Sequence, residues 1–430
     1  MMKQRADQPA KQAWQTRLRW LMPGLGVKRW LLLLTFGVGL LGLGGAFALG
    51  GRYPLSQHLY YLTLQFLPHG LRVALFLVGG MGAIGYSVWK LNQSIMAPFL
   101  QNTHAPIPEV LFDYRRRGRG PRIVVIGGGH GQAAALRGLK AFTSNLTAVV
   151  TVADDGGSSG RLRREIGILP PGDFRNCIAA LADDESLVTR LFQYRFANGQ
   201  DLSGHSFGNL FITAMAGITG SFEGALNESS QVLAVQGRVL PSTLEAVTLC
   251  ADVQVKDSDT TVRICGESDI PAVRGQILRV TLEPTTPSAY PGVIQAILTA
   301  DLVVIGPGSL YTSILPNLLV PEIVEALRAT QALIVYVCNV ATQRGETEHY
   351  SAQAHLAALE HHLGEDVIDA VLVNTLLPHG IPLPEGVEWV RPDLKATGRI
   401  RVIGADVADE RLGGHHNSQK LAQTLLKLLV

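Results

Sequence analysis

The stretch with the richest chemistry is Thr151 to Arg161, TVADDGGSSGR, which continues into LPPGDFRN over Leu169 to Asn176. It combines carboxylates, serine hydroxyls, arginines and several glycines. Glycine lets a backbone approach a ligand closely, and hydroxyls and free amides suit phosphate. For any one residue, a solvated connection is the simpler interpretation. Long loops inside compact domains are uncommon unless functional or disordered, so the combination favours a phosphate-binding loop.

Asp154 and Asp155 lie 23 and 24 residues beyond Gly131. A carboxylate about 20 residues past a glycine turn commonly holds a ribose hydroxyl. Two adjacent carboxylates equally suit Mg²⁺ bridging to a phosphate, because hard cations select oxygen ligands. Both interpretations stay open. If the protein is catalytic, Asp154, Asp155 and Arg175 are the candidates, with Arg161 or Arg164 also able to offset phosphate charge.

A second polar block, LSGHSFGN, contains His205 and Asn209 four residues apart. A helical turn would place both side chains on one face. A lone histidine is more often structural than catalytic. This one stands beside glycines at an expected helix start, which raises its odds of a functional role.

A strand–turn–helix–strand pattern positions the first loop. Residues 122–126 predict an apolar strand, Gly127 to Gly131 a glycine turn, and 132–142 a helix, and a strand at 148–153 follows. In such a unit a phosphate binds at the helix N-terminus. The GxGxxG fingerprint is not met, because Gln132 occupies the third glycine position.

The same rhythm returns later in the chain. Strands at 301–305 and 332–337 lead into polar loops at 306–313 and 338–347, and 370–373 predicts a fifth strand ending at Asn374. Ligands of open parallel sheets bind outside the carboxyl ends of the strands. The sequence therefore predicts an α/β, Rossmann-like, mostly parallel sheet with one crevice.

The segment 231–280 has a different pattern. Short alternating runs predict an inserted β-rich lobe with strands at 232–235, 248–255, 260–265 and 277–282. We expect a lid or dimer surface there, and no chemistry.

The N-terminal region predicts a membrane anchor. Residues 31–50 and 73–89 lack charges, and each is long enough to span a bilayer. A buried hairpin and a cleavable signal peptide are the alternatives. Basic residues concentrate before the first run, so the positive-inside rule places both termini in the cytoplasm; they are Lys3, Arg5, Lys11, Arg17, Arg19, Lys28 and Arg29.

The expected organisation is an anchor at 1–98, a basic linker at 99–121, and a cytosolic nucleotide-binding domain at 122–430 on the plasma (inner) membrane. The linker run RRRGRGPR, from Arg115 to Arg122, fits a juxtamembrane segment near anionic lipid. The bilayer is thus an expected partner, and nucleic acid is not. The four cysteines, Cys177, Cys250, Cys265 and Cys338, lack CxxC spacing. We expect isolated thiols in a reduced compartment.

Four blocks resemble the YvcK family of gluconeogenesis factors, within the CofD-like superfamily of 2-phospholactate transferases. They are VTVADDGGSSGRLR with LPPGDFRN, LSGHSFGNL, IGPGSLYTSILPNLLVP and CNVATQRGETEHY. The resemblance covers about Ile123 to Asn374. The family's first loop usually reads GGGTG, and here His130 replaces the threonine.

The resemblance implies a CofD-like fold that binds a UDP-sugar such as UDP-N-acetylglucosamine and controls cell-wall precursors and cell shape. A homodimer and a cell-wall enzyme or regulatory kinase are the implied protein partners. A CofD-type transferase, moving a 2-phospholactyl-type group from a nucleotide diphosphate donor, is the alternative. A dehydrogenase is the weakest interpretation, because the third glycine is missing. No cofactor is assigned beyond the UDP-sugar and Mg²⁺ at Asp154 and Asp155.

The loops and the four blocks together supply the candidate ligand-binding residues. These are Gly127, Gly128, Gly129, Gly131, Asp154, Asp155, Ser158, Ser159, Arg161, Gly172, Asp173, Arg175, Asn176, His205, Asn209, Gly306, Gly308, Ser309, Tyr311, Asn317, Asn339, Thr342, Gln343, Glu346 and Thr347. Within this set, we expect Ser309 to meet a diphosphate and the Tyr311 ring to stack on a base or sugar.

Overall fold

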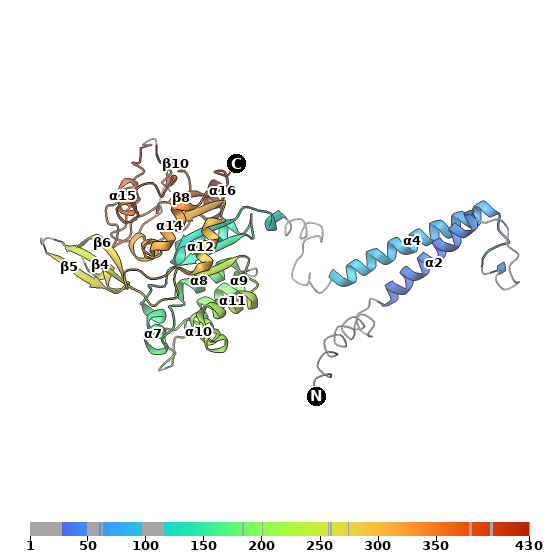
Figure 1. Cartoon of the computed structure of the whole chain (residues 1–430), viewed down its shortest axis with the longest axis horizontal. Coiled ribbons are helices and arrows are strands. Elements are labelled where there is room, and N and C mark those ends of the chain that lie inside the picture. Colours follow the sequence, from blue (N-terminus) through green and yellow to red (C-terminus); the bar gives the residue numbers. More distant parts are fainter. Residues whose placement is uncertain are drawn as a thin grey trace, which may run out of the picture. The chain divides into compact units, whose positions relative to one another are not determined.

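The structure is a computed structural model with two compact units, residues 1–111 and 112–430, which we describe separately (Figure 1). It describes residues 28–49, 60–61, 63–96, 116–182, 185–199, 201–256, 258, 260–273, 275–377, 381–395 and 399–429. The basic residues Lys3 to Arg19, Arg115 and most of the expected linker lie outside the described residues.

The N-terminal unit is a pair of apolar helices, α2 (Lys28–Leu49) and α4 (His69–Met96). They pack against each other through glycines. A side chain added at Gly80 would meet the backbone of Leu41 and the carbonyl of Gly37. Small residues at such contacts allow two membrane helices to approach closely.

Both helices direct apolar side chains outward, including Leu32, Phe36, Val78 and Met81, each more than half exposed. In the described part of the chain, Arg29–Leu49 and His69–Gln93 are long and apolar enough to cross a membrane. Leu310–Leu318 and Pro321–Ala329 together pass the same test but are bent by 74°. This bent pair packs in the core of the C-terminal unit, where Ile314, Leu318 and Ile323 are buried.

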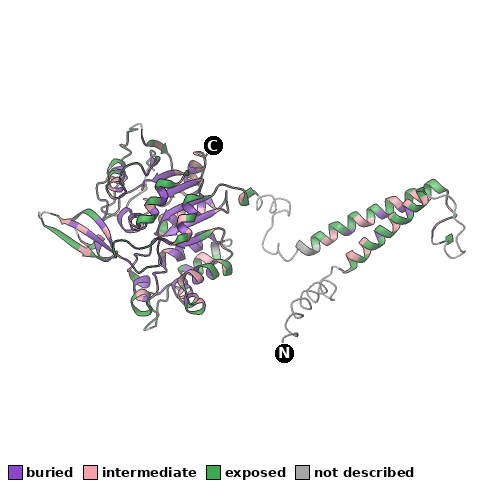
Figure 2. Cartoon of the chain, in the orientation of Figure 1, coloured by how far each residue is buried: buried purple, intermediate pink, exposed green. Residues whose placement is uncertain are grey.

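The C-terminal unit contains a seven-stranded sheet in the order β10-β9-β8-β7-β1-β2-β3, and every pairing in it is parallel. This confirms the predicted α/β class. The strands are β1 (Ile123–Gly127), β2 (Leu146–Val150), β3 (Arg238–Pro241), β7 (Leu302–Ile305), β8 (Leu333–Val337), β9 (Ala370–Asn374) and β10 (Arg401–Ala405). Continuous apolar runs form the inner strands because helices cover both faces (Figure 2).

Helices form two layers around this sheet. On one face of the sheet α6 contacts α8 and α16, and on the other face α12 contacts α14. The two layers lie on opposite faces because the chain leaves β1 and β7 in opposite directions and both crossovers are right-handed. The helices are α6 (Gly129–Leu139), α7 (Gly157–Ile166), α8 (Gly172–Leu181), α9 (Glu185–Gln193), α10 (Phe207–Thr219), α11 (Phe222–Val232), α12 (Pro291–Leu298), α13 (Leu315–Leu318), α14 (Pro321–Ala329), α15 (Ala352–Leu363) and α16 (Ser418–Leu426), with short turns η3 (Ile270–Ala272) and η4 (Leu310–Ile314).

The predicted β-rich lobe is an antiparallel three-stranded sheet, ordered β5-β4-β6. It consists of β4 (Thr248–Val255), β5 (Thr261–Cys265) and β6 (Gly275–Glu283), and it projects from the body as an arm (Figure 1). The expected strand at 232–235 is wrong, because Val232 ends α11 and Ala234 lies in a turn with φ of +48°.

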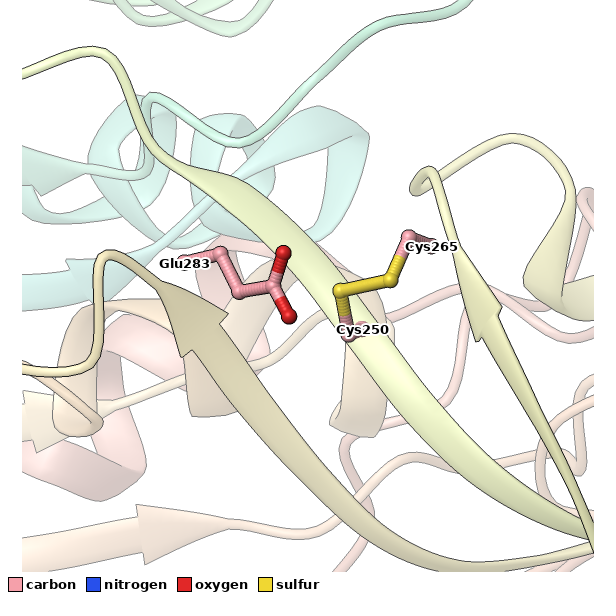
Figure 3. A group of neighbouring side chains, drawn as sticks. All are labelled: Cys250, Cys265 and Glu283. Atoms are coloured by element: carbon pink, nitrogen blue, oxygen red, sulfur yellow. A yellow bond between two sulfur atoms is a disulfide. The ribbon is translucent and has the colours of Figure 1, made fainter.

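Two of the four cysteines are paired, so the prediction of isolated thiols is wrong for them. Cys250 on β4 and Cys265 on β5 lie directly opposite each other and form a disulfide (Figure 3). Glu283 lies beside it and binds Arg263 at 2.8 Å. Because the sulfurs are bonded to each other, they are not thiolate ligands for a metal, although these three residues are clustered. Cys177 and Cys338 are buried and free, as expected.

Candidate functional site

The strand order reverses between β1 and β7, and the polar loops meet there. From β1 the chain moves outward to β2, whereas from β7 it moves the opposite way to β8. Such a topological switch point opens a crevice at the carboxyl ends of the two strands. The loop after β1 touches the loop after β7, since a side chain at Gly131 would collide with the Pro307 carbonyl. The predicted convergence of loops is confirmed for this pair.

Helix α6 starts at Gly129, earlier than expected, so its first turn includes the glycine run. The N-cap residue Gly128 has no side chain, and the Gly129 amide donates to the Asp173 carboxylate; the other first-turn amides suit an anion. Gln132, at the missing third glycine, is fully buried. Its Nε2 donates to Val125 O and Val149 O, both at 2.8 Å, so the side chain ties β1 to β2.

The loop after β7 is held by an asparagine from the next strand's loop. Asn339 accepts from Gly308 N at 3.2 Å and donates to Gly308 O at 2.7 Å. Ser309 is half-buried, and no hydrogen bond of its hydroxyl is recorded in the described part of the chain. Ser309 lines the space between the loops.

A cavity of about 600 Å³ lies between these loops. Its walls include nine of the predicted residues, namely Gly128, Gly129, Gly131, Asn176, Gly308, Ser309, Asn339, Thr342 and Gln343. His130 also lines it, and burial followed by the charge of Arg175 lowers the pKa of this imidazole. Neutral histidine, hydroxyls and amides make a polar wall suited to a phosphorylated ligand.

Carboxyl groups gather beside the cavity. Asp173 accepts from the backbone of Gly129, and its pKa is raised to about 7 by burial and then by Asp154. Burial also raises the pKa of Asp154 itself. Glu267, from the arm, has its pKa raised to about 8 by burial and by neighbouring carboxylates. Crowded, partly desolvated carboxyls favour the protonated form, or a bound cation.

Asp154 and Asp155 have different hydrogen-bond partners, and the expectation that both hold one metal ion stays a prediction. Asp154 Oδ1 accepts from Gly156 N at 2.9 Å. Asp155 accepts from Glu267 N, Ser268 N and Ser268 Oγ at 3.1, 3.0 and 2.8 Å. Asp155 therefore anchors the turn after β5. Asp154 and Asp173 are the neighbouring carboxylates that fit a hard cation.

Two serines, a histidine and an asparagine, each predicted separately as a ligand-binding residue, lie together. Ser158 Oγ lies 3.0 Å from His205 Nδ1 and 3.0 Å from Asn209 Nδ2, and Ser159 Oγ lies 3.3 Å from the same amide. His205 precedes the Ser206 N-cap of α10, so the two residues converge on Ser158 without sharing a helical turn. The hydroxyls are thus held in fixed positions on the first turn of α7, between Gly172 and α10.

Arg175 is buried and lies between this cluster and the carboxylates. Its Nη1 donates to Ser206 Oγ at 2.7 Å and its Nη2 to Asn176 Oδ1 at 3.0 Å. Burial and then Arg195 lower its pKa, while Asp173 and Asp154 act in the opposite direction. Its Nε has no hydrogen-bond partner among the described residues. Arg161 instead donates to Ser203 O at 2.7 Å, at the exposed rim.

Several predicted residues lie behind the cavity wall. Tyr311 is 2% exposed, its hydroxyl is 2.9 Å from Tyr350 Oη, and its ring packs against His362. The expected stacking on a ligand is therefore wrong. Asn317 ties Gly127 O to Ser313 O, and Thr347 accepts from Gln343 N. These two support the loops, as do buried Gly306 and Glu346.

Some site residues were missed by sequence reasoning. Asp409, Leu412, Gly414, His415, His416 and Ser418 line the cavity, although they lie far along the chain. The run Gly413-Gly414-His415-His416 before a helix was the available signal. His416 is turned to Cys338 O at 3.2 Å, and burial lowers its pKa to about 4. Glu267 was missed because it belongs to the arm.

Comparison with known proteins identifies the family of the C-terminal unit. A family model described as 2-phospho-L-lactate transferase CofD matches residues 123–408. The chain belongs to the CofD family. The match begins at β1 and includes every loop of the candidate site up to Ala408.

Relatives within the CofD family include the Bacillus subtilis gluconeogenesis factor, which is 47% identical over 73% of this chain and 99% of its own length. A crystal structure of a UPF0052 member from Bacillus halodurans has 43% identity and a TM-score of 0.65, and covers 72% of this chain and 99% of its own. A Nostoc sp. relative is 46% identical over 95% of this chain and 92% of its own length. That match necessarily includes most of the N-terminal unit.

Proposed function

We propose that this protein is a membrane-tethered regulator that binds a nucleotide sugar of the UDP-N-acetylglucosamine type. Control of cell-wall precursors and cell shape is the role proposed for it. The observation that carries the proposal is the switch-point cavity, where the N-terminus of α6, the Gly308–Ser309 loop and the Asn339 clamp meet. Free amides and a hydroxyl around one space are what a diphosphate requires.

The size and polarity of the cavity support a nucleotide-sized ligand. A volume of about 600 Å³ falls within the range of small-molecule sites, roughly 300–1,000 Å³. A larger hollow of about 1250 Å³ lies between the arm and residues 344–350. It contains neither glycine loop, so the switch-point cavity is the better candidate for the diphosphate.

Mg²⁺ is proposed as an accessory ion. Asp154 and Asp173 supply oxygen donors next to the cavity, and the raised pKa of each carboxyl fits a site completed by a cation. A bound ion would neutralise phosphate charge. Arg175 would add a fixed positive charge from the other side, and Ser158 and Ser159 would contribute hydroxyls.

A transferase of the CofD type is the second candidate, favoured by the carboxylate pair beside the cavity and by the family match. Prolonged incubation of the full chain with UDP-N-acetylglucosamine, Mg²⁺ and candidate acceptors separates the two. A regulator returns the bound ligand unchanged. Steady release of a nucleoside monophosphate that stops in Asp154→Asn would establish a transferase instead.

The membrane tether is proposed from the two apolar helices, with the C-terminal unit in the cytoplasm. Both α2 and α4 are long enough to cross the hydrocarbon core of a bilayer, and both direct apolar side chains outward. A homodimer and a cell-wall enzyme or regulatory kinase remain proposed partners. A regulator that binds a sugar nucleotide close to the membrane would couple the supply of cell-wall precursors to the enzymes that act there.

A further inference from the structure

The arm carries a disulfide immediately before a turn that contacts the candidate site. Cys265 is the last residue of β5, and Gly266 N donates to Leu249 O at 2.8 Å next to the disulfide. The next two residues, Glu267 and Ser268, donate three hydrogen bonds to the Asp155 carboxylate. Only Gly266 therefore separates the disulfide from Glu267, which lies at the edge of the site formed by Asp154, Asp155 and Asp173. We call these carboxylates the acidic edge.

Apart from the disulfide, few contacts hold β5 in place. β5 is an edge strand that pairs only with β4, and four of its five residues are exposed. It buries little apolar surface, so its position depends on the ladder, on Arg263 and on the disulfide. A cross-link closing a loop of about 15 residues limits opening substantially.

The disulfide is also open to chemical attack. Cys265 is exposed and Cys250 is buried. Exposed disulfides are the labile ones, and disulfides in a reducing cytoplasm are usually transient or redox-sensing. A structural cross-link would gain nothing from this exposure.

We propose that Cys250 and Cys265 form a thiol–disulfide switch that controls the acidic edge of the ligand site. In the oxidised state, the disulfide fixes β5 and the Gly266–Asp269 turn against Asp155. In the reduced state, β5 and the turn loosen, Asp155 loses the hydrogen bonds from Glu267 and Ser268 that hold the loop before Ser158 and Ser159, and ligand binding weakens. The reductant is a protein dithiol, and the ligand part of the proposal rests on the proposed function.

The chemistry is ordinary thiol–disulfide exchange. One thiolate of the dithiol attacks Cys265 Sγ, the Cys250–Cys265 bond breaks, and the Cys250 sulfur takes the electron pair and a proton. The second thiolate then attacks the mixed disulfide, releases Cys265 as a thiol after protonation, and leaves the reductant as a disulfide. Two electrons and two protons are transferred to the arm.

The first test needs no ligand. Hydrogen exchange of residues 260–269 is measured by mass spectrometry on the full chain in detergent micelles, oxidised or treated with a protein dithiol. Exchange should become at least about tenfold faster on reduction. The Cys250→Ser/Cys265→Ser variant should exchange like the reduced protein in both conditions, and Cys177→Ala should respond like the wild type. A disulfide that the dithiol does not reduce, or equal exchange in both states, would overturn the switch.

The second test measures UDP-N-acetylglucosamine affinity in the same two states. Reduction should weaken binding about three- to tenfold in the wild type and leave the double variant unchanged. Faster exchange with unaltered affinity would overturn the link to the site. Absence of binding in both states would contradict the proposed function, while the exchange measurement would still decide whether the arm is redox-controlled.

Discussion

At the scale of single residues, the site is built by side chains that hold the backbone in position. The Asn339 side chain binds both the N–H and the carbonyl of Gly308. Asn317 donates to the Gly127 carbonyl, and Gln132 joins β1 to β2. Each uses an amide group, which can donate and accept at once. The loops are thereby fixed before a ligand arrives, which reduces the entropy cost of binding.

Tyr311 tests this distinction between support and contact. Tyr311→Ala should lower the free energy of unfolding by roughly 3–5 kcal/mol, because it empties a buried aromatic position and strands the Tyr350 hydroxyl. UDP-N-acetylglucosamine affinity of the folded fraction should change less than about threefold. Urea unfolding and calorimetry measure the two effects, and Tyr311→Phe is the matched control. A stable variant with greatly reduced affinity would restore the ring to the ligand site.

Glu346 gives a pH-dependent prediction. Burial raises its pKa from 4.5 to about 7, against hydrogen bonds from Tyr311 N and Thr312 Oγ that lower it. The folded state therefore retains a proton that the unfolded chain loses first. This contribution to stability is complete below about pH 4.5 and declines as pH rises to about 7.

Glu346→Gln should remove that contribution. Relative to the wild type, the variant should gain on the order of 2–3 kcal/mol between pH 4.5 and 8, because a neutral amide needs no proton there. Urea midpoints across this range provide the measurement. Exposed Glu348→Gln serves as the control and should parallel the wild type. Identical pH profiles for wild type and Glu346→Gln would show that Glu346 is ionised throughout.

The signal for the site was uneven along the sequence. The glycine loops were predictable, because glycine and hydroxyl residues directly follow apolar strands whose ends must meet. The ring of Tyr311 was not, because an aromatic two residues beyond a loop can point either way. His415 and His416 were not, since only the packing of α16 on α6 brings their segment to the cavity.

At the scale of elements, strands with continuous apolar residues were predictable and short edge strands were not. β1, β7, β8 and β9 each contain mostly Val, Ile and Leu, which a sheet covered on both faces requires. β3 has only four residues, and β10 is half exposed at an edge. Both β3 and β10 form by pairing with strands that are distant in the sequence, so the local hydrophobic periodicity does not predict them.

The α2–α4 contact is an element-scale prediction. Gly80→Leu should separate the helices, because its side chain would meet Leu41 and the Gly37 carbonyl. Gly82→Leu is the control, since nothing lies within 4 Å of that position. Spin labels at Phe36 and Met81 would report a longer, broader distance distribution for Gly80→Leu alone. An unchanged distribution would contradict the glycine-mediated contact.

At the scale of the whole molecule, one chain joins a pair of long apolar helices to a CofD-family unit. The relative from Nostoc sp. matches across both units, whereas the Bacillus subtilis protein matches only 73% of this chain. The candidate site lies in the unit that the family model matches. The proposed tether would therefore hold this family domain at a membrane.

Topology is the prediction at this scale. A reporter fused after Lys90 should lie in the cytoplasm, and one inserted near Gln57 should lie outside, because basic residues precede the first span. Paired phosphatase and fluorescent-protein fusions measure both. An active external phosphatase after Lys90 would reverse the orientation and place the binding unit outside the cytoplasm.

The central claim, a nucleotide sugar bound at the switch-point cavity, is tested by calorimetric titration of the full chain in micelles with UDP-N-acetylglucosamine. Wild type is compared with Ser309→Asp, and with Ser309→Asn as the neutral control of equal shape. We predict saturable one-site binding that falls at least about 100-fold in the Asp variant, because its carboxylate repels the diphosphate. The Asn variant should lose less than about tenfold. No binding by wild type, or equal affinity in the Asp variant, would contradict the account.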